Sequence, residues 1–407
     1  MFWKKQSFET IKSEIFEALG NNLNYKNNSI LGLPGSYLDQ EAFYDDAPFL
    51  SDAPFISTMI ANPNHIGCHT LAGDSEVFFK GTQSLEKKLI ELIAVEILNA
   101  DEQSIDGYVA PGGTEANIQA MWCYRNYFKK EFGAKQEEIC LVFSEDSHYS
   151  MPKGANLLNL NSMTIPVDFE TRAWDTKAFK DLLDDAKKRG NKYFIVICNC
   201  ATTMFGSVDG IDDIADVLKA SEIEYKIHGD AAYGGFIYPF TNPESRFQFS
   251  NPNLSSITID GHKMLQAPYG TGLFLIRKGF MEYCKTEEAN YVQGKDYTIC
   301  GSRSGANAIS MWMILNVHGS LGWQSNMETL ISRTDDICKR LDDRNIEYFR
   351  NPFINIVTIK SKYLTKALAK KHFLVGDNHE NPTWHKIVVM PHVKRGLIDQ
   401  FFLDLDA

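Results

Sequence analysis

Short apolar runs alternate with segments of helical periodicity from about residue 85 to about residue 280. Four of the runs are rich in β-branched and aromatic residues and are bounded by polar or glycine-containing segments, which is typical of buried strands. They are ICLVF (139–143), YFIVIC (193–198), SSITI (255–259) and GLFLI (272–276). The segments 114–130, 176–189 and 211–220 repeat apolar residues every three or four positions, which indicates helices. Strands joined by crossover helices form largely parallel sheets, so the sequence predicts an α/β fold.

Polar residues that can cap helices stand at the start of two of these segments. We expect Thr114 to cap the first helix, and Asp175 or Thr176 to cap the second. Their short side chains can accept hydrogen bonds from the free amides of a first helical turn.

The two ends of the chain depart from this pattern. Residues 1–55 hold one helical stretch and a turn-rich segment, which we expect to form an N-terminal arm. Residues 56–300 are the predicted large domain. In residues 301–407 two helical segments precede the strand-like FINIVTI and HKIVVM, which predicts a small α+β domain. A chain of 407 residues is long enough for one large core with such an addition.

Composition narrows the classes of partner. The formal net charge of -11 and the lack of a long basic run argue against nucleic-acid binding, which needs clustered Lys and Arg. The chain contains no signal-peptide-like start and no run of roughly 18 uncharged apolar residues, so we expect no membrane partner and a cytoplasmic location. The eight cysteines lack CxxC spacing and are interpreted as reduced thiols.

The run at 255–259 leads directly into Gly-His-Lys, which places Lys263 at the carboxyl end of a predicted strand. Such ends form the ligand crevice of open α/β sheets. A partly desolvated lysine forms Schiff bases, because burial lowers its pKa toward a neutral, nucleophilic amine. Taken alone, the motif is more simply a surface lysine after a strand. The other motifs of the chain, described next, favour the Schiff-base lysine instead.

Asp230 follows another short apolar segment in YKIHGDAAYGG and precedes small residues. A carboxylate at this place can hold a pyridinium nitrogen protonated, which makes a pyridoxal ring an electron sink. Ala231 and Ala232 would let a flat ring approach the backbone. Lys263 and Asp230 together therefore favour pyridoxal 5'-phosphate as the cofactor.

A glycine pair supplies a candidate phosphate site. Gly112 and Gly113 stand immediately before the predicted helix that Thr114 caps. Exposed amides at a helix N-terminus, with a nearby hydroxyl, suit a phosphate monoester. The segment matches neither GxGxxG nor GxxxxGK[ST], so nicotinamide and P-loop nucleotides lose support.

Two further turns supply candidate contacts to the ring. His148 follows the run at 139–143, and its imidazole could stack on the cofactor. Thr202 and Thr203 follow the run at 193–198, and a hydroxyl there could bond the phenolate or a substrate carboxylate.

Five motifs occur together in an informative order: PGGTEAN, DSHYS, HGDAAYGG, GHK and ICGSRSGA. In order and approximate spacing, residues 80–320 resemble the group II pyridoxal-phosphate-dependent decarboxylases, and most closely the compact bacterial histidine decarboxylases and plant serine decarboxylases. GSRSG also resembles archaeal tyrosine/aspartate decarboxylases and sphingosine-phosphate lyases. The resemblance implies a type I, aspartate aminotransferase-like fold and a homodimer with shared active sites.

The same resemblance assigns roles to residues that match its motifs. It implies that Lys263 holds the cofactor, that Asp230 contacts the pyridine nitrogen and that His148 stacks on the ring. The remaining implied cofactor contacts are Gly112, Gly113, Thr114, Thr202, Thr203, Ala232, His262 and Arg303.

Three assignments leave alternatives open. The family often has Gly-Thr-Thr where this chain has Ala201-Thr202-Thr203, so either threonine could touch the ring. A catalytic tyrosine is expected on a loop ahead of GSRSG, where Tyr291 fits best and Tyr297 second. Arg303 could bind phosphate or fix the dimer, and a structural salt bridge is an equal alternative.

The implied reaction is removal of the α-carboxylate of an amino acid to give an amine and carbon dioxide, with Tyr291 or His148 returning a proton to the α-carbon. Histidine or an aromatic substrate is favoured over serine or an acidic one. His65 and His69 in NPNHIGCHT are the candidate contacts to the substrate side chain. Zinc held by His65, Cys68 and His69 would lack a fourth ligand, so we expect no metal.

Other readings of the chain keep the same cofactor residues. An aldehyde lyase acting on a phosphorylated amino alcohol would need a second phosphate site, and an aminotransferase would produce a ketoacid. A non-catalytic scaffold would not need Lys263, Asp230 and His148 together. Analysis of the products separates the enzyme classes.

Overall fold

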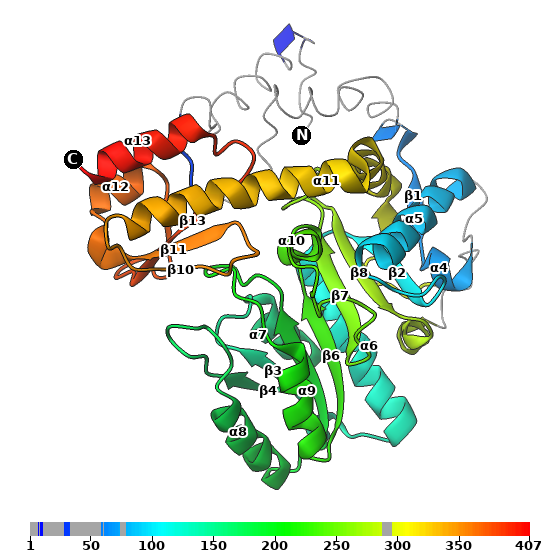
Figure 1. The fold of residues 1–407 in the computed structure, drawn as a ribbon. Helices are drawn as coiled ribbons and strands as arrows, with labels where there is room; N and C mark the ends of the chain where they lie inside the picture. Colours follow the sequence, from blue (N-terminus) through cyan, green and yellow to red (C-terminus); the bar gives the residue numbers. More distant parts are fainter. Residues whose placement is uncertain are drawn as a thin grey trace.

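The structure, a computed structural model, describes residues 7, 9–10, 28–32, 58–59, 61–73, 79–286 and 295–407. Within them, a seven-stranded sheet of order β2-β8-β7-β6-β5-β3-β4 forms the centre of the large domain (Figure 1). The strands are β2 (Ile105–Ala110), β3 (Ile139–Ser144), β4 (Asn161–Ile165), β5 (Tyr193–Asn199), β6 (Glu224–Asp230), β7 (Leu254–Asp260) and β8 (Gly272–Arg277). Strands β4, β3, β5, β6 and β7 pair in parallel, whereas β8 is antiparallel to both of its neighbours. The predicted α/β class is confirmed.

Side chains that alternate along the strands build one hydrophobic cluster on each face of this sheet. In β3, Leu141 packs in the cluster of α6 (Gly113–Phe132) and α7 (Ser150–Leu158), whereas Val142 packs in the cluster of α8 (Thr176–Lys188) and α9 (Ile211–Ala220). Helices therefore cover both faces of the sheet, so a ligand-binding site is expected at the carboxyl ends of the strands.

Of the two predicted helix N-caps, the structure confirms one and contradicts the other. The Asp175 carboxylate accepts a hydrogen bond from the amide of Ala178, as predicted. The prediction for Thr114 is wrong, because α6 begins at Gly113 and no side chain caps it. Its first amides are therefore left without a side-chain acceptor from the chain.

The C-terminal part forms a second layer of structure. Strands β10 (Tyr348–Phe349), β11 (Ile356–Lys360), β13 (Trp384–Val388) and β12 (Val375–Gly376) make an antiparallel sheet. Helices α12 (Lys366–Lys371) and α13 (Arg395–Leu405) contribute to its hydrophobic core. The domain boundaries given by the sequence remain predictions.

One long helix, α11 (Gly305–Asp342), runs over the large sheet to the small domain (Figure 1). This helix includes both helical segments that the sequence predicts at the start of residues 301–407. Its helical geometry is interrupted at Gly319, where φ is 61°. Beside its start, β1 (Asn64–Ile66) pairs with β9 (Ser302–Ser304). Of the predicted N-terminal arm, residues 7, 9–10 and 28–32 are described, and Leu31 exchanges backbone hydrogen bonds with His372 and Val388.

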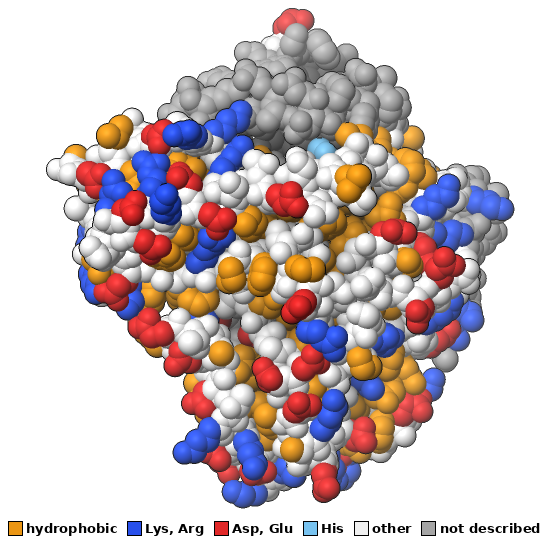
Figure 2. Space-filling view, viewed as in Figure 1, with side chains coloured by type: hydrophobic (Ala, Val, Ile, Leu, Met, Phe, Trp, Pro, Cys, Tyr) orange, Lys and Arg blue, Asp and Glu red, His pale blue; other side chains and the backbone are white. Residues whose placement is uncertain are grey.

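The outer surface is of mixed charge on the face drawn in Figure 2, where Lys and Arg are interspersed with Asp and Glu. Such mixing is unlike the gathered positive charge of a nucleic-acid interface. No helix in the described ranges is long and apolar enough to span a bilayer.

Candidate active site

A cavity of about 610 Å³ lies at the carboxyl ends of the parallel strands and the N-terminus of α6. Asn199, Asp230 and Asp260, the last residues of β5, β6 and β7, all line it. The structure brings the predicted cofactor contacts together here, except for Arg303. They are Gly112, Gly113, Thr114, His148, Thr202, Thr203, Asp230, Ala232, His262 and Lys263.

Asp230 is almost buried, at 7% exposure, and its two carboxylate oxygens have separate donors. Oδ2 accepts a hydrogen bond of 3.0 Å from Nδ2 of Asn117, and Oδ1 accepts one of 3.1 Å from the amide of Ala232. Both bonds fix the carboxylate at the cavity wall. It is therefore ready to pair with a protonated ring nitrogen.

Lys263 is paired with an acid that the sequence reading did not single out. Its Nζ lies 3.1 Å from Oδ2 of Asp260, and Nε2 of His262 lies 3.7 Å from the same oxygen. Asp260 itself is packed against the backbone of Gly113. The amine, the buried acid and the start of α6 thus share one wall.

His148 lines the cavity as a neutral ring. Burial lowers its pKa and the nearby Lys263 adds to the effect, while Asp230 opposes it. Nδ1 accepts a hydrogen bond of 3.2 Å from the amide of Ser150, so the neutral ring carries its proton on Nε2.

The two candidate threonines differ in their exposure and in their hydrogen-bond partners. The hydroxyl of Thr202 is buried and lies 2.7 Å from that of Ser207. Thr203 is exposed at the cavity, and its carbonyl accepts a hydrogen bond from Nζ of the buried Lys386. Ala201, just before them, has a φ of 70°, the left-handed region that glycine adopts most easily.

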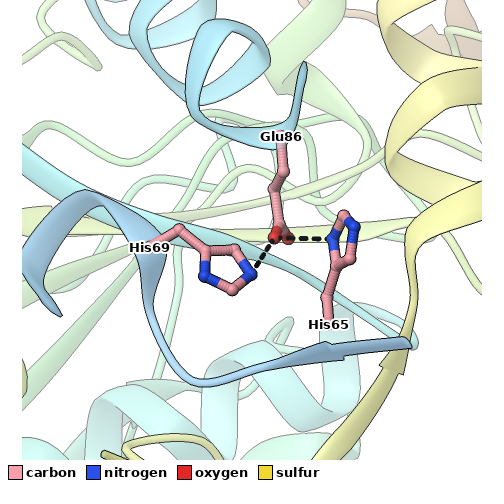
Figure 3. Close-up of side chains that lie close together, drawn as sticks. All are labelled: His65, His69 and Glu86. Carbon is pink, nitrogen blue, oxygen red and sulfur yellow. Dashed lines mark hydrogen bonds and ion pairs between the residues drawn. The ribbon is translucent and has the colours of Figure 1, made fainter. Parts of the chain in front are cut away.

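The structure does not bring Arg303, His65 and His69 to this cavity. All three surround Glu86 of α5 (Lys80–Leu92), a buried carboxylate, and Figure 3 shows the two histidines pointing toward it. Nη1 of Arg303 lies 2.5 Å from it, Nδ1 of His65 lies 3.0 Å away, and Nε2 of His69 lies 3.3 Å away. Arg303 is thus in the salt bridge that the sequence left as its alternative.

The ligand atoms of His65, His69 and Glu86 lie within 4.8 Å of one another, a spacing that a metal ion could bridge. However, the guanidinium of Arg303 already contacts both oxygens of Glu86. Its positive charge opposes a cation at the same carboxylate. The cluster is therefore better explained as a buried ion pair with two histidines.

Of the two candidate catalytic tyrosines, the structure describes Tyr297. Tyr291 lies outside the described residues. Tyr297 is buried in the hydrophobic cluster around α6, and its carbonyl accepts a hydrogen bond from Gln119. Neither its ring nor its backbone lines the cavity.

Several lining residues were missed by sequence reasoning. Asn117 and Glu115 belong to the PGGTEAN motif, and their place in the first turns of α6 could have identified them. Burial raises the pKa of Glu115 to about 7, against the opposing hydrogen bond from Tyr108. Three apolar lining residues come from scattered positions outside the five motifs, namely Ile118, Leu157 and Ile356, whereas Ile299 begins ICGSRSGA.

Comparison with known proteins gives consistent matches. The pyridoxal-dependent decarboxylase conserved domain matches residues 80–355. A tryptophan decarboxylase of Clostridium sporogenes is 49% identical over 406 residues, covering 99% of this chain and 97% of that protein. A probable L-tyrosine/L-aspartate decarboxylase of Methanocella arvoryzae is 32% identical over 360 residues, covering 86% and 91%. The structure of a Burkholderia pseudomallei sphingosine-1-phosphate lyase superposes with a TM-score of 0.80 at 17% identity, over 100% of this chain and 91% of that one, which shows a shared fold.

Proposed function

The chain belongs to the pyridoxal-dependent decarboxylase family, and from this premise we propose that it decarboxylates an aromatic L-amino acid, with tryptophan as the first candidate. That it is a pyridoxal-phosphate-dependent amino acid decarboxylase follows from the family and its relatives. The observation that carries the choice of tryptophan is the 49% identity to a tryptophan decarboxylase along nearly the whole chain.

The lining of the cavity supports an aromatic side chain. Ile118, Leu157, Ile299 and Ile356 offer apolar contacts, and Tyr149 offers an aromatic one. Among the lining residues that the structure describes, Lys263 is the only lysine or arginine. An acidic substrate would need a further cation to pair with its side chain, so the lining favours an apolar ring.

The residues present fit the cofactor. The uncapped start of α6 offers amides to a phosphate group, Asp230 offers a carboxylate, and Lys263 offers an amine within the same cavity. When bound, pyridoxal phosphate supplies an electron sink for the electron pair that departing carbon dioxide leaves on the α-carbon.

We assign these residues complementary tasks. Lys263 holds the cofactor covalently, and the Asp260 carboxylate beside it keeps its amine at the carboxyl end of β7. Asp230 holds a proton on the ring nitrogen, and the neutral His148 packs on the ring face. Thr203, exposed at the cavity, offers its hydroxyl to the ring or the substrate. Tyr291 or His148 remains the proton donor proposed from the sequence.

We propose that the protein acts as a homodimer. Large apolar side chains are exposed around the cavity mouth: Tyr149 at 63%, Leu157 at 65% and Ile299 at 43%. Tyr269, which stacks near His262, is 70% exposed. Apolar surface gathered around a site favours coverage by another protein surface, and a second copy would complete the cavity wall.

We also propose that the protein works in the cytoplasm. The observation in favour is that the eight cysteines are free thiols, and nearly all are buried. Unpaired thiols are typical of proteins in a reducing compartment.

The experiment is measurement of carbon dioxide release by the purified, cofactor-loaded protein with each of the twenty amino acids. We expect release from tryptophan, with tyrosine and phenylalanine slower, and accumulation of the matching amine. Release from histidine, serine or glutamate alone would contradict the proposed substrate class. The K263A variant is the control and should release no carbon dioxide.

A further inference from the structure

A chain of buried hydrogen bonds runs behind the cavity and ends on Asp230. It starts at Tyr124 of α6 and passes through Ser256 of β7, His228 of β6 and Asn117 of α6. The four side chains are at most 1% exposed, so each must find its partners within the protein.

The chemistry of the partners fixes the direction of each bond. The carbonyl oxygen of Asn117 can only accept, so Nε2 of His228, 2.9 Å away, carries the proton. A neutral imidazole has one N–H, and Nδ1 of His228 therefore accepts from the hydroxyl of Ser256 at 2.7 Å. The hydroxyl of Tyr124 in turn donates to Ser256 over 2.6 Å. Every donor thus points toward Asn117.

The side-chain amide of Asn117 donates two hydrogen bonds, which connect the network to Asp230 and, through Ser150, to His148. Its Nδ2 donates to Oδ2 of Asp230 over 3.0 Å and to the hydroxyl of Ser150 over 3.2 Å. The hydroxyl of Ser150 then donates to Nδ1 of His148 at 2.9 Å. The proposed partner of the ring nitrogen and the proposed stacking residue are therefore two ends of one network.

The members stay neutral over the ordinary range of pH. Burial lowers the pKa of His228 to about 4, although Asp230 opposes the shift, and burial raises the pKa of Tyr124 well above its usual value. The hydrogen bonds of the network therefore keep the same donors and acceptors over this range of pH.

We propose that Tyr124, Ser256, His228 and Asn117 are positioning residues that fix the orientation of the Asp230 carboxylate and keep the proton of His148 on Nε2. The inference rests on the proposed roles of Asp230 and His148. Its consequence is that Tyr124, Ser256 and His228, which do not line the cavity, influence the affinity for the cofactor and the protonation of its ring. Tyr124 is the most distant of them along the network.

The test compares variants of His228 and Ser256 in the full-length protein. H228L removes the donor to Asn117, whereas H228Q keeps an N–H that can replace Nε2. S256A is a milder second variant, because it frees His228 to move its proton to Nδ1. Y225F, on the same strand but outside the network, is the matched control.

The readouts are the dissociation constant of pyridoxal phosphate, by titration of its visible absorbance, and the pH at which the bound cofactor changes colour. We expect H228L to weaken binding about tenfold, S256A to weaken it less, and both to shift the colour change. H228Q should recover most of the affinity, and Y225F should match the unmodified protein.

Wild-type affinity and an unchanged colour profile in folded H228L and S256A would overturn this inference alone. Failure of the unmodified protein to bind the cofactor would overturn both the proposed function and this inference. Equal losses in H228L and H228Q would show a packing role for His228 and would also contradict the inference.

Discussion

Asp260 faces Lys263 on one side, with Oδ2 lying 3.1 Å from Nζ, and packs against the backbone of Gly113 on the other. The last residue of β7 is thereby tied to the first residue of α6, although 147 positions separate Gly113 from Asp260 (260 minus 113). The position of the amine therefore depends on the absence of a side chain at Gly113.

Gly113→Ala tests this dependence. An added Cβ would lie 2.9 Å from Oδ2 of Asp260, so the carboxylate and the amine it holds must shift. We expect cofactor affinity to fall about tenfold or more while the fold is retained, since alanine favours helices. The matched control is Gly81→Ala in α5, whose Cβ meets no atom within 4 Å and should leave cofactor affinity unchanged. Equal cofactor affinity in the two variants would contradict the account.

Ala201 offers a test of backbone strain beside the cavity, because its φ is 70°. A glycine there would relieve about 1–2 kcal/mol of strain. Extra unfolded-state entropy of about 0.5–1 kcal/mol and loss of a buried methyl, about 0.8 kcal/mol, offset this gain. We expect A201G to stay within about 1 kcal/mol of the original free energy of unfolding.

A201V should instead lower that free energy by more than about 2 kcal/mol, because a β-branched residue resists the left-handed region. Denaturant unfolding measures both variants. A valine tolerated as well as glycine would show that the turn is not strained.

The ion pair of Arg303 with Glu86 predicts a stability effect away from the cavity. Arg303→Met leaves a buried carboxylate unpaired, which costs roughly 3–5 kcal/mol in the free energy of unfolding. Neutralising the acid as well, in E86Q/R303M, should recover most of this loss. The control K188M breaks the exposed pair with Asp185 and should cost less than about 1 kcal/mol. A double variant no more stable than R303M would contradict an ionic cause.

His69 gives the pH dependence of stability a defined sign. Burial lowers the pKa of His69 from 6.5 to about 4, although Glu86 opposes the shift. Between these values the unfolded chain binds the proton and the folded chain does not, so stability present above pH 6.5 is lost as pH falls toward 4. The loss from this residue is roughly 3 kcal/mol.

The measurement is the difference in unfolding free energy between the original protein and H69Q at several pH values. Because H69Q lacks this titration, its disadvantage at neutral pH should shrink as pH falls from 6.5 to 4. A difference that is constant over this range would contradict the buried, neutral state of His69.

The central strands were predictable because their apolar runs are continuous. Runs such as 139–143 and 272–276 match β3 and β8 to within one residue. In β2, by contrast, Asp106 and Gly107 interrupt the apolar pattern, and the buried Asp106 accepts a hydrogen bond from the amide of Gly279. That partner lies far along the chain, so the sequence gives no local sign of it.

The same distinction applies to the site. Lys263 and Asp230 could be predicted because they follow strands, and parallel strands bring their ends to one edge. The positions of His65 and Arg303 depend on Glu86, which looks like an ordinary polar residue within a helix. Ser256 likewise reads as part of a strand, and only the folded structure reveals its bond to His228.

The central claim is that this decarboxylase carries its cofactor on Lys263. Borohydride reduction of the purified, cofactor-loaded protein, followed by peptide mass spectrometry, tests it most directly. We expect the mass of the reduced cofactor on the peptide that contains Lys263, and no such adduct in K263A. An adduct on another lysine, such as the buried Lys386, or no adduct at all, would contradict it.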